Sequence, residues 1–315
     1  GVDRDMLLCA KLGGKVVGQV FTLPRRVKLR DNTFRVGAVA FMAVHPDFRR
    51  RGIARSLMEK VVKTAEEKGF DALTLFTHPA PLSHAYPLYE RLGFKTFYST
   101  NPQMKVLDPW FLAKAIGRPY LALLMWLKAR VKDITLPEGF MIRRYEQKDR
   151  PRCVALVKEH VEQFDYVELV SEDFWVWWQE SMPEAANPKT LVLERNGELI
   201  GTIACYTSAG KAKGKRGEIE FQMGGIGNLF YKRGYEQQVQ SLIGRVLKEL
   251  KRLGAPVATN MMSPNVFQPT DFLRRVWGKH GFIKNKDIEQ IFMYKSLNSE
   301  FDGLEALKTF YIQPF

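Results

Sequence analysis

One set of local patterns occurs twice along this chain at a nearly constant spacing, which constrains it to two copies of one architecture. The segment 14–20, GKVVGQV, resembles the segment 197–203, GELIGTI, at a shift of 183 residues. Each predicts a β-hairpin with a turn at its first glycine. Gly52 and Gly234, each at the start of a helical pattern, are 182 residues apart. So constant a shift over several elements indicates an internal duplication.

Hydrophobic periodicity predicts strands and helices in both copies. In the first copy we expect strands at 6–11, 16–23, 34–44, 71–76, 95–99 and 103–107, and helices at 52–68 and 83–92. In the second copy we expect strands at 140–145, 189–195, 199–207 and 217–227, and helices at 149–162, 171–182, 234–253 and 270–279. The first copy has no counterpart of residues 140–182, and the chain does not begin with methionine. We therefore expect an N-terminally truncated first domain.

These elements predict an α/β (α+β) fold, in which each domain has a mixed, mostly antiparallel twisted sheet flanked by helices. We expect a first domain at 1–108, a helical linker at 109–137, a second domain at 138–298 and a C-terminal tail at 299–315. Within the linker, the apolar run at 120–127 is followed by basic residues. It is either a helix at a membrane surface or a helix buried between domains or in a dimer contact, and we favour burial.

Composition excludes several classes of protein. A hydrophobic content of 45% is enough for packed cores. The three cysteines are odd in number and widely spaced, so they favour neither a disulfide framework nor a metal site, and a cytoplasmic location is expected. The five histidines have no metal-ligand spacing, so no metal is predicted. No run approaches the roughly 20 apolar residues of a membrane span.

The positive charge lies mostly in the first part of the chain. Residues 1–135 carry 23 Lys and Arg against 11 Asp and Glu, whereas residues 136–315 carry 25 against 23. An anionic cofactor or a nucleic acid would each favour this distribution. No basic stretch is interleaved with stacking aromatics, so no nucleic-acid partner is expected.

The segment 44–58, VHPDFRRRGIARSLM, predicts the end of a strand, a basic turn and the start of an amphipathic helix. Backbone N–H groups at a helix start have no partner within the helix, and the helix dipole is positive there, so this turn can hold an anion. Three successive arginines, Arg49, Arg50 and Arg51, add charge suited to phosphate. No P-loop and no dinucleotide-binding glycine pattern is present.

The pattern R-x-x-G-x-A of Arg49, Gly52 and Ala54, after a strand ending in V-x-P, resembles the acyl-CoA pyrophosphate loop of the GNAT N-acetyltransferase family. The resemblance implies transfer of an acetyl group from acetyl-CoA, without a metal, to a primary amine of a small molecule or peptide. It places the pantetheine chain on Met42, Ala43 and Val44. It places the pyrophosphate on the backbone of Arg49, Arg50, Arg51, Gly52, Ile53 and Ala54.

The segment 89–94, YERLGF, resembles the family's Y-x-x-x-G-F segment, whose tyrosine is the acid that protonates the leaving thiolate. The resemblance gives this role to Tyr89, with core packing as the alternative reading and Tyr86 as a substitute one turn earlier. The asparagine that many members carry seven residues before the tyrosine is Leu82 here. No base is evident, because the strand position of a family glutamate is Ala38, and His45, His78 and His84 fit turn or surface positions.

The second copy departs from the family pattern at two places. In its loop, YKRGYE at 231–236, Tyr231 replaces the Gln or Arg and Glu236 puts a carboxylate where a pyrophosphate would lie. At the acid position, Trp277 has no proton to give to sulfur. We therefore expect catalysis in the first domain and a degenerate second domain, with a homodimer possible. The alternatives are a non-catalytic acyl-CoA-binding or regulatory protein and, on charge alone, a nucleic-acid-binding protein.

Overall fold

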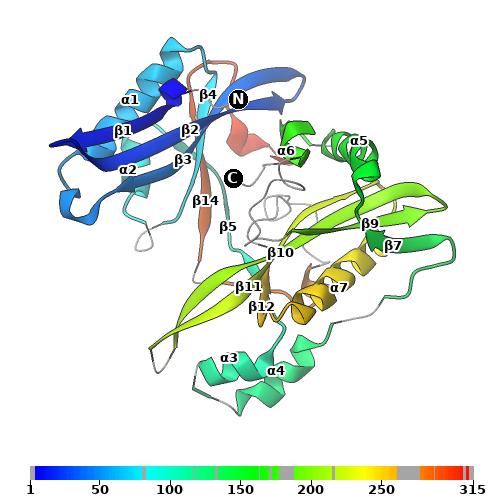
Figure 1. The fold of residues 1–315 in the computed structure, drawn as a ribbon. Helices are drawn as coiled ribbons and strands as arrows, with labels where there is room; N and C mark the ends of the chain where they lie inside the picture. Colours follow the sequence, from blue (N-terminus) through cyan, green and yellow to red (C-terminus); the bar gives the residue numbers. More distant parts are fainter. Residues whose placement is uncertain are drawn as a thin grey trace.

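The computed structural model describes residues 4–79, 83–115, 117–118, 120–131, 134–162, 164–169, 172–176, 188–214, 217–260, 277–286, 288–307 and 310–311. They form two mostly antiparallel sheets flanked by helices (Figure 1), which confirms the predicted fold class. The parallel neighbours are β3 with β4, β11 with β12, and β8 with β15.

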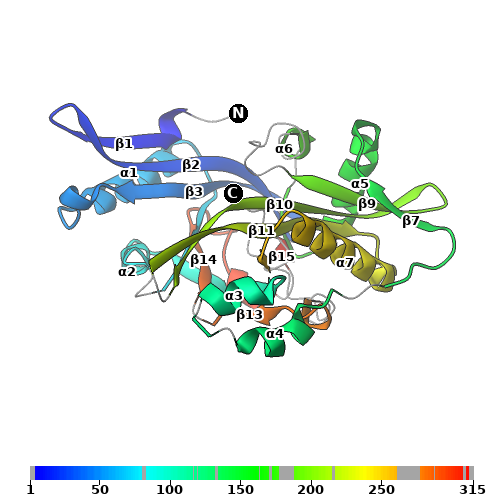
Figure 2. The same cartoon turned by 60° about the horizontal axis from the view of Figure 1, so that its bottom comes forward.

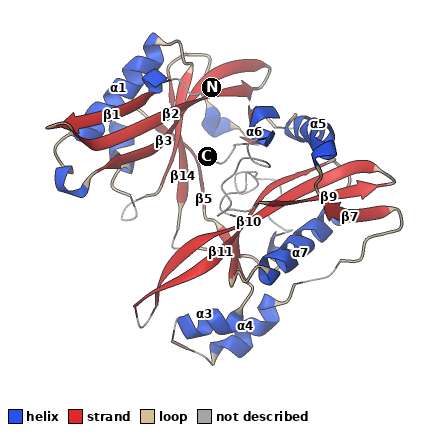
Figure 3. Ribbon diagram, viewed as in Figure 1, coloured by secondary structure: helices blue, strands red, loops and turns tan. Residues whose placement is uncertain are grey.

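The first sheet has the strand order β15-β8-β2-β3-β4-β14-β5, with β1 paired to β2. Its strands are β1 (Leu7–Leu12), β2 (Lys15–Leu29), β3 (Asn32–Val44), β4 (Ala72–Thr77), β5 (Lys95–Thr100), β8 (Tyr166–Glu168), β14 (Gln290–Ser296) and β15 (Phe310–Tyr311). Helix α1 (Ile53–Glu67) covers this sheet (Figure 3), and the short α2 (Tyr86–Arg91) follows β4 (Figure 1).

The second sheet has the strand order β13-β6-β12-β11-β10-β9-β7. Its strands are β6 (Gln103–Val106), β7 (Phe140–Arg144), β9 (Lys189–Arg195), β10 (Glu198–Gly214), β11 (Gly217–Tyr231), β12 (Val257–Thr259) and β13 (Ile283–Lys284). Helix α7 (Glu236–Arg252) packs on β9, β10 and β11, as does α5 (Arg150–Val161) on β10 and β11. Helix α6 (Glu172–Val176) follows β8.

The repeated segments form the predicted hairpins. Gly13 and Gly14 connect β1 to β2, and Asn196 and Gly197 connect β9 to β10, all with positive φ as two-residue hairpin turns require. The second glycine of each segment has a packing role. A Cβ on Gly18 would lie 2.9 Å from Ile53 Cγ2, and one on Gly201 would lie 3.3 Å from Leu242 Cδ1. Both positions therefore let a helix lie close to the sheet.

Three predicted elements differ from the structure in extent. Strand β2 continues to Leu29 because it pairs with β3 up to a turn at Arg30. Strands β10 and β11 continue to Gly214 and Tyr231, because they pair with each other past the ends of their ladders with β9 and β12. Of the helix expected at 270–279, residues 270–276 lie outside the described residues, as do residues 177–182 of the one expected at 171–182.

Each sheet contains a strand from the other end of the chain. Strand β14 lies between β4 and β5 of the first sheet, although it follows most of the second sheet in sequence (Figure 1). In turn, β6 lies between β12 and β13 of the second sheet. Neither sheet is therefore built from one continuous segment.

The linker forms two short helices, α3 (Pro109–Ala115) and α4 (Leu121–Ala129), which lie side by side at one end of the molecule (Figure 2). Ala122 and Ala129 are buried, whereas Leu123 and Trp126 are exposed. The helix thus has one packed and one exposed apolar face. Among the described residues, no helix is long and apolar enough to cross a membrane.

A buried ionic cluster joins β7, β9 and the start of α5. Arg143 donates to both oxygens of Asp149 at 2.6 and 2.8 Å and to both oxygens of Glu194 at 3.0 and 2.7 Å. These hydrogen bonds, with Arg143 the largest cause, hold the pKa of the Asp149 carboxyl well below its usual value and lower the pKa of Glu194. Both carboxylates therefore stabilise the fold only while they are ionised.

We expect Phe292→Ala in β14 to lower the free energy of unfolding by about 3 to 5 kcal/mol, because Phe292 is fully buried among Phe76, Phe97 and Tyr166. All six tryptophans lie after residue 109, so their fluorescence reports on the linker and the second copy and not on residues 1–109. The strand exchange predicts that this signal and circular dichroism shift together in urea. Val16→Ala, at an exposed position, is the control. If Phe292→Ala left the urea midpoint of tryptophan fluorescence unchanged, the predicted coupling between the two sheets would be contradicted.

We expect Asp149→Asn to lower the free energy of unfolding at pH 7 by roughly 3 kcal/mol, because it leaves Arg143 partly unpaired. The pKa of Asp149 is depressed in the folded state. Its contribution to the free energy of unfolding is therefore complete well above pH 4, and it is lost as the pH falls from there toward the pKa of the folded state. The difference from wild type should therefore narrow between pH 5 and pH 3 in urea titrations. The exposed Glu67→Gln should show no such trend, and a constant difference for Asp149→Asn would refute the assignment.

Candidate functional site

Strands β3 and β4 part at the end where the sequence places its candidate residues. Their parallel ladder runs from Val36 with Ala72 to Val39 with Leu75 and then ends, while β3 continues to Val44. The register between β2 and β3 also shifts there, and Phe41 has a φ of 53°. This bulge bends β3, and its backbone beyond Val39 has no ladder partner on the β4 side.

The three pantetheine candidates lie on this unpaired end of β3. Met42 is half-buried and packs against the core cluster under α1, whereas Ala43 is exposed. The carbonyl of Val44 accepts a hydrogen bond from Arg49 Nε at 3.2 Å. The backbone around Met42 and Ala43 is therefore available to an extended ligand that enters between the two strands.

The basic turn continues directly from this strand end. A single 3-10 turn, η2 (Pro46–Phe48), leads to Arg50 and Gly52, whose φ values are 60° and 79°, and α1 begins at Ile53. No side chain caps the start of α1, and a Cβ on Gly52 would meet nothing within 4 Å. The first N–H groups of the helix thus face open space, as an anion cradle requires.

The three arginines of the turn are exposed. Arg49 is directed back to Val44, and Arg51 lies over the Phe48 ring at 5.2 Å. None of the three forms an ion pair with a described residue, so the turn keeps its positive charge as far as the described carboxylates are concerned. Ile53 and Ala54 are half-buried in the first turn of α1.

An open cavity of about 390 Å³ lies beside the cradle, between α1 and α2. Its lining residues are Gly52, Arg55, His84, Pro87, Leu88 and Arg91. The sequence analysis missed Arg55 and Arg91. Arg55 could have been predicted, because it lies three residues after Gly52 in the first turn of the helix. Arg91 could not, because only the packing of α2 places it at the cavity.

Tyr89 lies on α2 and is 95% buried, in the core cluster that also contains Val39 and against which Met42 packs. Its ring contacts Phe94 at 5.9 Å, and its carbonyl accepts the Phe94 N–H at 3.0 Å. The hydroxyl has no hydrogen-bond partner among the described residues. Burial raises the pKa of this hydroxyl, which therefore stays protonated at neutral pH. Both readings of Tyr89, core packing and proton donation, fit this position.

The other candidate residues are spread over the first half. His84 lines the cavity beside the cradle, His45 Nδ1 accepts from the Asp47 N–H at 3.4 Å, and His78 Nδ1 lies 2.6 Å from the Glu289 carbonyl. Tyr86 Oη lies 3.3 Å from Thr96 Oγ1, and Ala38 is fully buried. Leu82 lies outside the described residues.

The second copy repeats the strand geometry of the first, but its turn carries a carboxylate. The β11–β12 ladder ends at Gly225 with Thr259, and Asn228 has a φ of 52° beside a register shift, as Phe41 does. In the turn that follows, the Gly234 N–H donates to Glu236 Oε1 at 3.0 Å. The chain's own carboxylate thus takes a backbone donor that an anionic ligand would use.

Trp277 occupies the position that corresponds to Tyr89. It is 98% buried, contacts Phe282 at 4.9 Å and accepts the Phe282 N–H on its carbonyl at 3.0 Å, as Tyr89 does with Phe94. Its Nε1–H has no hydrogen-bond partner in the part of the chain that the structure describes. The local backbone is kept, whereas the hydroxyl is absent.

Comparison with known proteins agrees with this geometry. The acetyltransferase (GNAT) family model matches residues 2–94. An acetyltransferase of Pectobacterium atrosepticum is 29% identical over 94 residues, which are 30% of this chain and 60% of the relative. An acetyltransferase of Sodalis glossinidius is 28% identical over 93 residues, 30% of this chain and 59% of the relative. The chain thus spans about 60% of the length of these relatives.

Similarity to solved structures extends over both copies. Two crystal structures of Saccharomyces cerevisiae N-myristoyltransferase with bound myristoyl-CoA are 13% and 11% identical and give TM-scores of 0.64 and 0.69. They cover 90% and 93% of this chain, and 67% of the yeast chain in each case. At this identity the likeness establishes the fold. The match to the acetyltransferase (GNAT) family model is limited to residues 2–94, whereas the shared fold extends over most of the chain.

Proposed function

We propose that this chain is an N-acyltransferase that moves an acetyl group from acetyl-CoA to a primary amine of a small molecule or peptide, with catalysis in the first half. One observation carries the proposal. The uncapped cradle at Gly52 is open and carries unneutralised arginines, whereas a carboxylate of the chain accepts from the equivalent turn at Gly234.

The donor would bind along the parted strands of the first sheet. Its pyrophosphate would accept from the backbone of Arg49, Arg50, Arg51, Gly52, Ile53 and Ala54. Its pantetheine amides would pair with the backbone of Met42, Ala43 and Val44 on the side where the ladder to β4 has ended. Arg55, Arg91 and His84 line the cavity at the pyrophosphate end and would contact the other phosphate of CoA.

The chemical step would be attack of a neutral amine nitrogen on the thioester carbonyl. A C–N bond forms, the C–S bond breaks, and the sulfur leaves as a thiolate, which takes a proton. Tyr89 is the proposed donor of that proton, because burial keeps its hydroxyl protonated and no described residue accepts from it. The amine gives up its own proton to solvent or to a base, and His84 at the pyrophosphate end is badly placed for that role.

The second half would then support the site without turning over CoA. The alternative function is a non-catalytic acyl-CoA-binding or regulatory protein, which the buried and well-packed position of Tyr89 favours. The myristoyl-CoA bound by the structural neighbours supports acyl-CoA as the donor class, so the length of the acyl chain is part of the test. The acceptor, a homodimer and a cytoplasmic location stay predictions.

We expect calorimetric titration with acetyl-CoA to show one site per chain. Gly52→Glu should weaken it by about tenfold or more, because a carboxylate would enter the phosphate position. Gly234→Glu, which changes the matching turn of the second copy, should leave affinity unchanged. Two equal sites would contradict the degenerate second copy. Absence of binding to acetyl-CoA and to myristoyl-CoA alike would refute both the enzyme and the binding protein.

We expect Tyr89→Phe to lower kcat by at least about tenfold while the affinity for acetyl-CoA is unchanged, because only the proton donor is removed. The measurement is release of free CoA thiol with a panel of primary amines. Tyr86→Phe is the matched control, since Tyr86 lies one turn away on the same helix. A loss confined to Tyr86→Phe would transfer the role to that residue. Wild-type binding with no turnover on any amine would favour the non-catalytic protein.

A further inference from the structure

The hairpin of helices α3 and α4 presents apolar side chains to solvent at one end of the molecule (Figure 1). The two helices contact each other, and α4 contacts β6. Trp110, Tyr120, Leu123 and Trp126 are nevertheless between 47% and 71% exposed. Burial, which the sequence favoured for residues 120–127, therefore applies to only part of α4.

The exposed side chains of α4 form one face. Tyr120, Leu123 and Trp126 are three residues apart, a spacing that places side chains on the same side of a helix. Tyr120 precedes the helix, but its φ of −62° and ψ of −23° are helical, so the face extends to it. With Trp110 of α3, the hairpin exposes three aromatic residues and one leucine.

The hairpin is fixed to the second sheet. The Phe111 ring contacts Phe221 of β11 at 5.6 Å. At the other end, the buried Lys105 of β6 donates through Nζ to the Arg130 carbonyl at 3.1 Å, just after α4. Asp108 accepts the Phe111 N–H at 3.1 Å and so caps α3. The exposed face is therefore held in a defined position on the body of the protein.

The segment that carries this face is positively charged. Residues 109–132, between Asp108 and Asp133, contain five lysines and arginines and no aspartate or glutamate. Lys114, Arg118 and Arg130 are exposed, and none of them forms an ion pair with a described residue. The hairpin thus combines exposed aromatic residues with positive charge.

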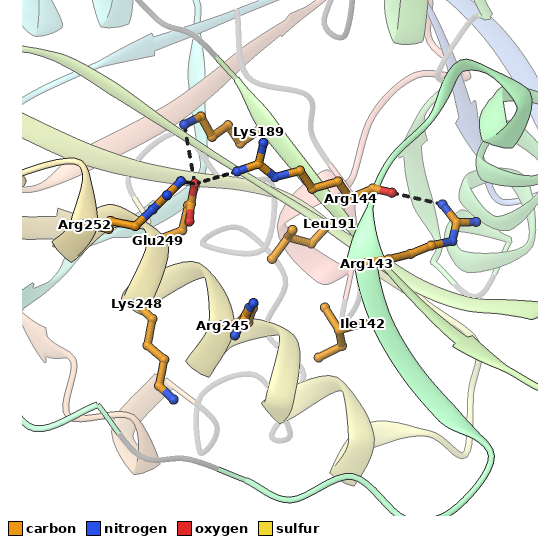
Figure 4. Close-up of a pocket in the computed structure, with 9 residues that line it drawn as sticks. All are labelled: Ile142, Arg143, Arg144, Lys189, Leu191, Arg245, Lys248, Glu249 and Arg252. Atoms are coloured by element: carbon orange, nitrogen blue, oxygen red, sulfur yellow. Dashed lines mark hydrogen bonds and ion pairs between the residues drawn. The ribbon is translucent and has the colours of Figure 1, made fainter.

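Another group of cations in this half has a partner within the chain. In the cavity between β7, β9 and α7 (Figure 4), Glu249 Oε1 lies 2.7 Å from Arg252 Nη2. The same oxygen lies 3.4 Å from Arg144 Nη2 and 3.4 Å from Lys189 Nζ. A carboxylate of the protein therefore pairs with these cations, whereas Lys114 and Arg118 keep their charge for an external partner.

We propose that the α3–α4 hairpin docks the protein on the surface of a lipid bilayer that contains anionic lipids. Tryptophan and tyrosine favour the boundary between headgroups and acyl chains. Lysine and arginine beside them are attracted to negatively charged headgroups. The hairpin would lie along the surface, with Leu123 and Trp126 directed toward the acyl chains. This proposal does not rest on the proposed acyltransferase function.

A second copy of the chain is a poorer match for this face. In a two-fold symmetric dimer, the same patch of each chain meets at the interface. Such a contact would bring Lys114, Arg118 and Arg130 of both chains together, and like charges repel. Anionic headgroups would neutralise the same side chains, so the charge favours the bilayer.

The test is sedimentation of the full chain with vesicles of phosphatidylcholine alone and with vesicles of equal parts phosphatidylcholine and phosphatidylserine. We expect binding to the anionic vesicles to be at least about tenfold tighter and to weaken as salt is added. Lys114→Gln with Arg118→Gln should weaken it by at least about tenfold. Leu123→Ser with Trp126→Ser should do the same, because it removes apolar area from the bilayer contact.

Matched controls separate this surface from the positive charge of the whole protein. Lys60→Gln with Lys63→Gln, on the exposed face of α1, removes the same charge and should leave binding unchanged. Leu12→Ser with Val16→Ser, at exposed positions of the β1–β2 hairpin, removes apolar side chains elsewhere and should also have no effect. Circular dichroism verifies that each variant folds.

A conservative pair keeps the proposal open to refutation. Lys114→Arg with Arg118→Lys retains both charges and should bind the anionic vesicles as the wild type does. Equal binding to both kinds of vesicle, or no binding to either, would overturn the proposal. So would unchanged binding in Lys114→Gln with Arg118→Gln or in Leu123→Ser with Trp126→Ser. Self-association in analytical ultracentrifugation that Leu123→Ser with Trp126→Ser abolishes would assign the face to a second copy instead.

Discussion

Pairing of β14 with β4 is the interaction on which the geometry of the first half depends. Strand β4 pairs with β14 over all six of its residues, but with β3 over only four. Because β14 holds β4 in the sheet, β3 can bend away after Val39 without loss of the strand. The opening between β3 and β4, where acyl-CoA is proposed to bind, thus depends on a strand that belongs, in sequence, to the second copy.

The two copies show which features a duplicated unit keeps when its chemistry changes. The bulge recurs at Phe41 and Asn228, and the aromatic contact recurs in Tyr89 with Phe94 and Trp277 with Phe282. These features support the backbone of the fold. Glu236, in contrast, changes the chemistry of its turn. Its carboxylate accepts a hydrogen bond from the Gly234 N–H, whereas the turn at Gly52 is open.

Local patterns predicted much of the fold, since periodicity and turn residues act over a few positions. The hairpins at Gly14 and Gly197, helix α1 after Gly52 and the mostly antiparallel sheets were all expected. Strand extents were less accurate where a neighbour decides them, as for β10 and β11. The exchange of β6 and β14 could not be expected, because a strand pattern carries no information about which sheet contains its partner.

By itself, then, the sequence determined the repeat, the basic turn at Arg49–Ala54 ahead of a helix and the contrast with the turn at 231–236, because each depends on residues adjacent in the chain. Only the tertiary structure decided which strands complete each sheet, that Met42 packs against the cluster that contains Tyr89, and that Arg91 lines the same cavity as Gly52. The same holds for the cations around Glu249, which come from segments far apart in sequence. Such sites arise when separate elements pack together, and spacing along the chain does not encode them.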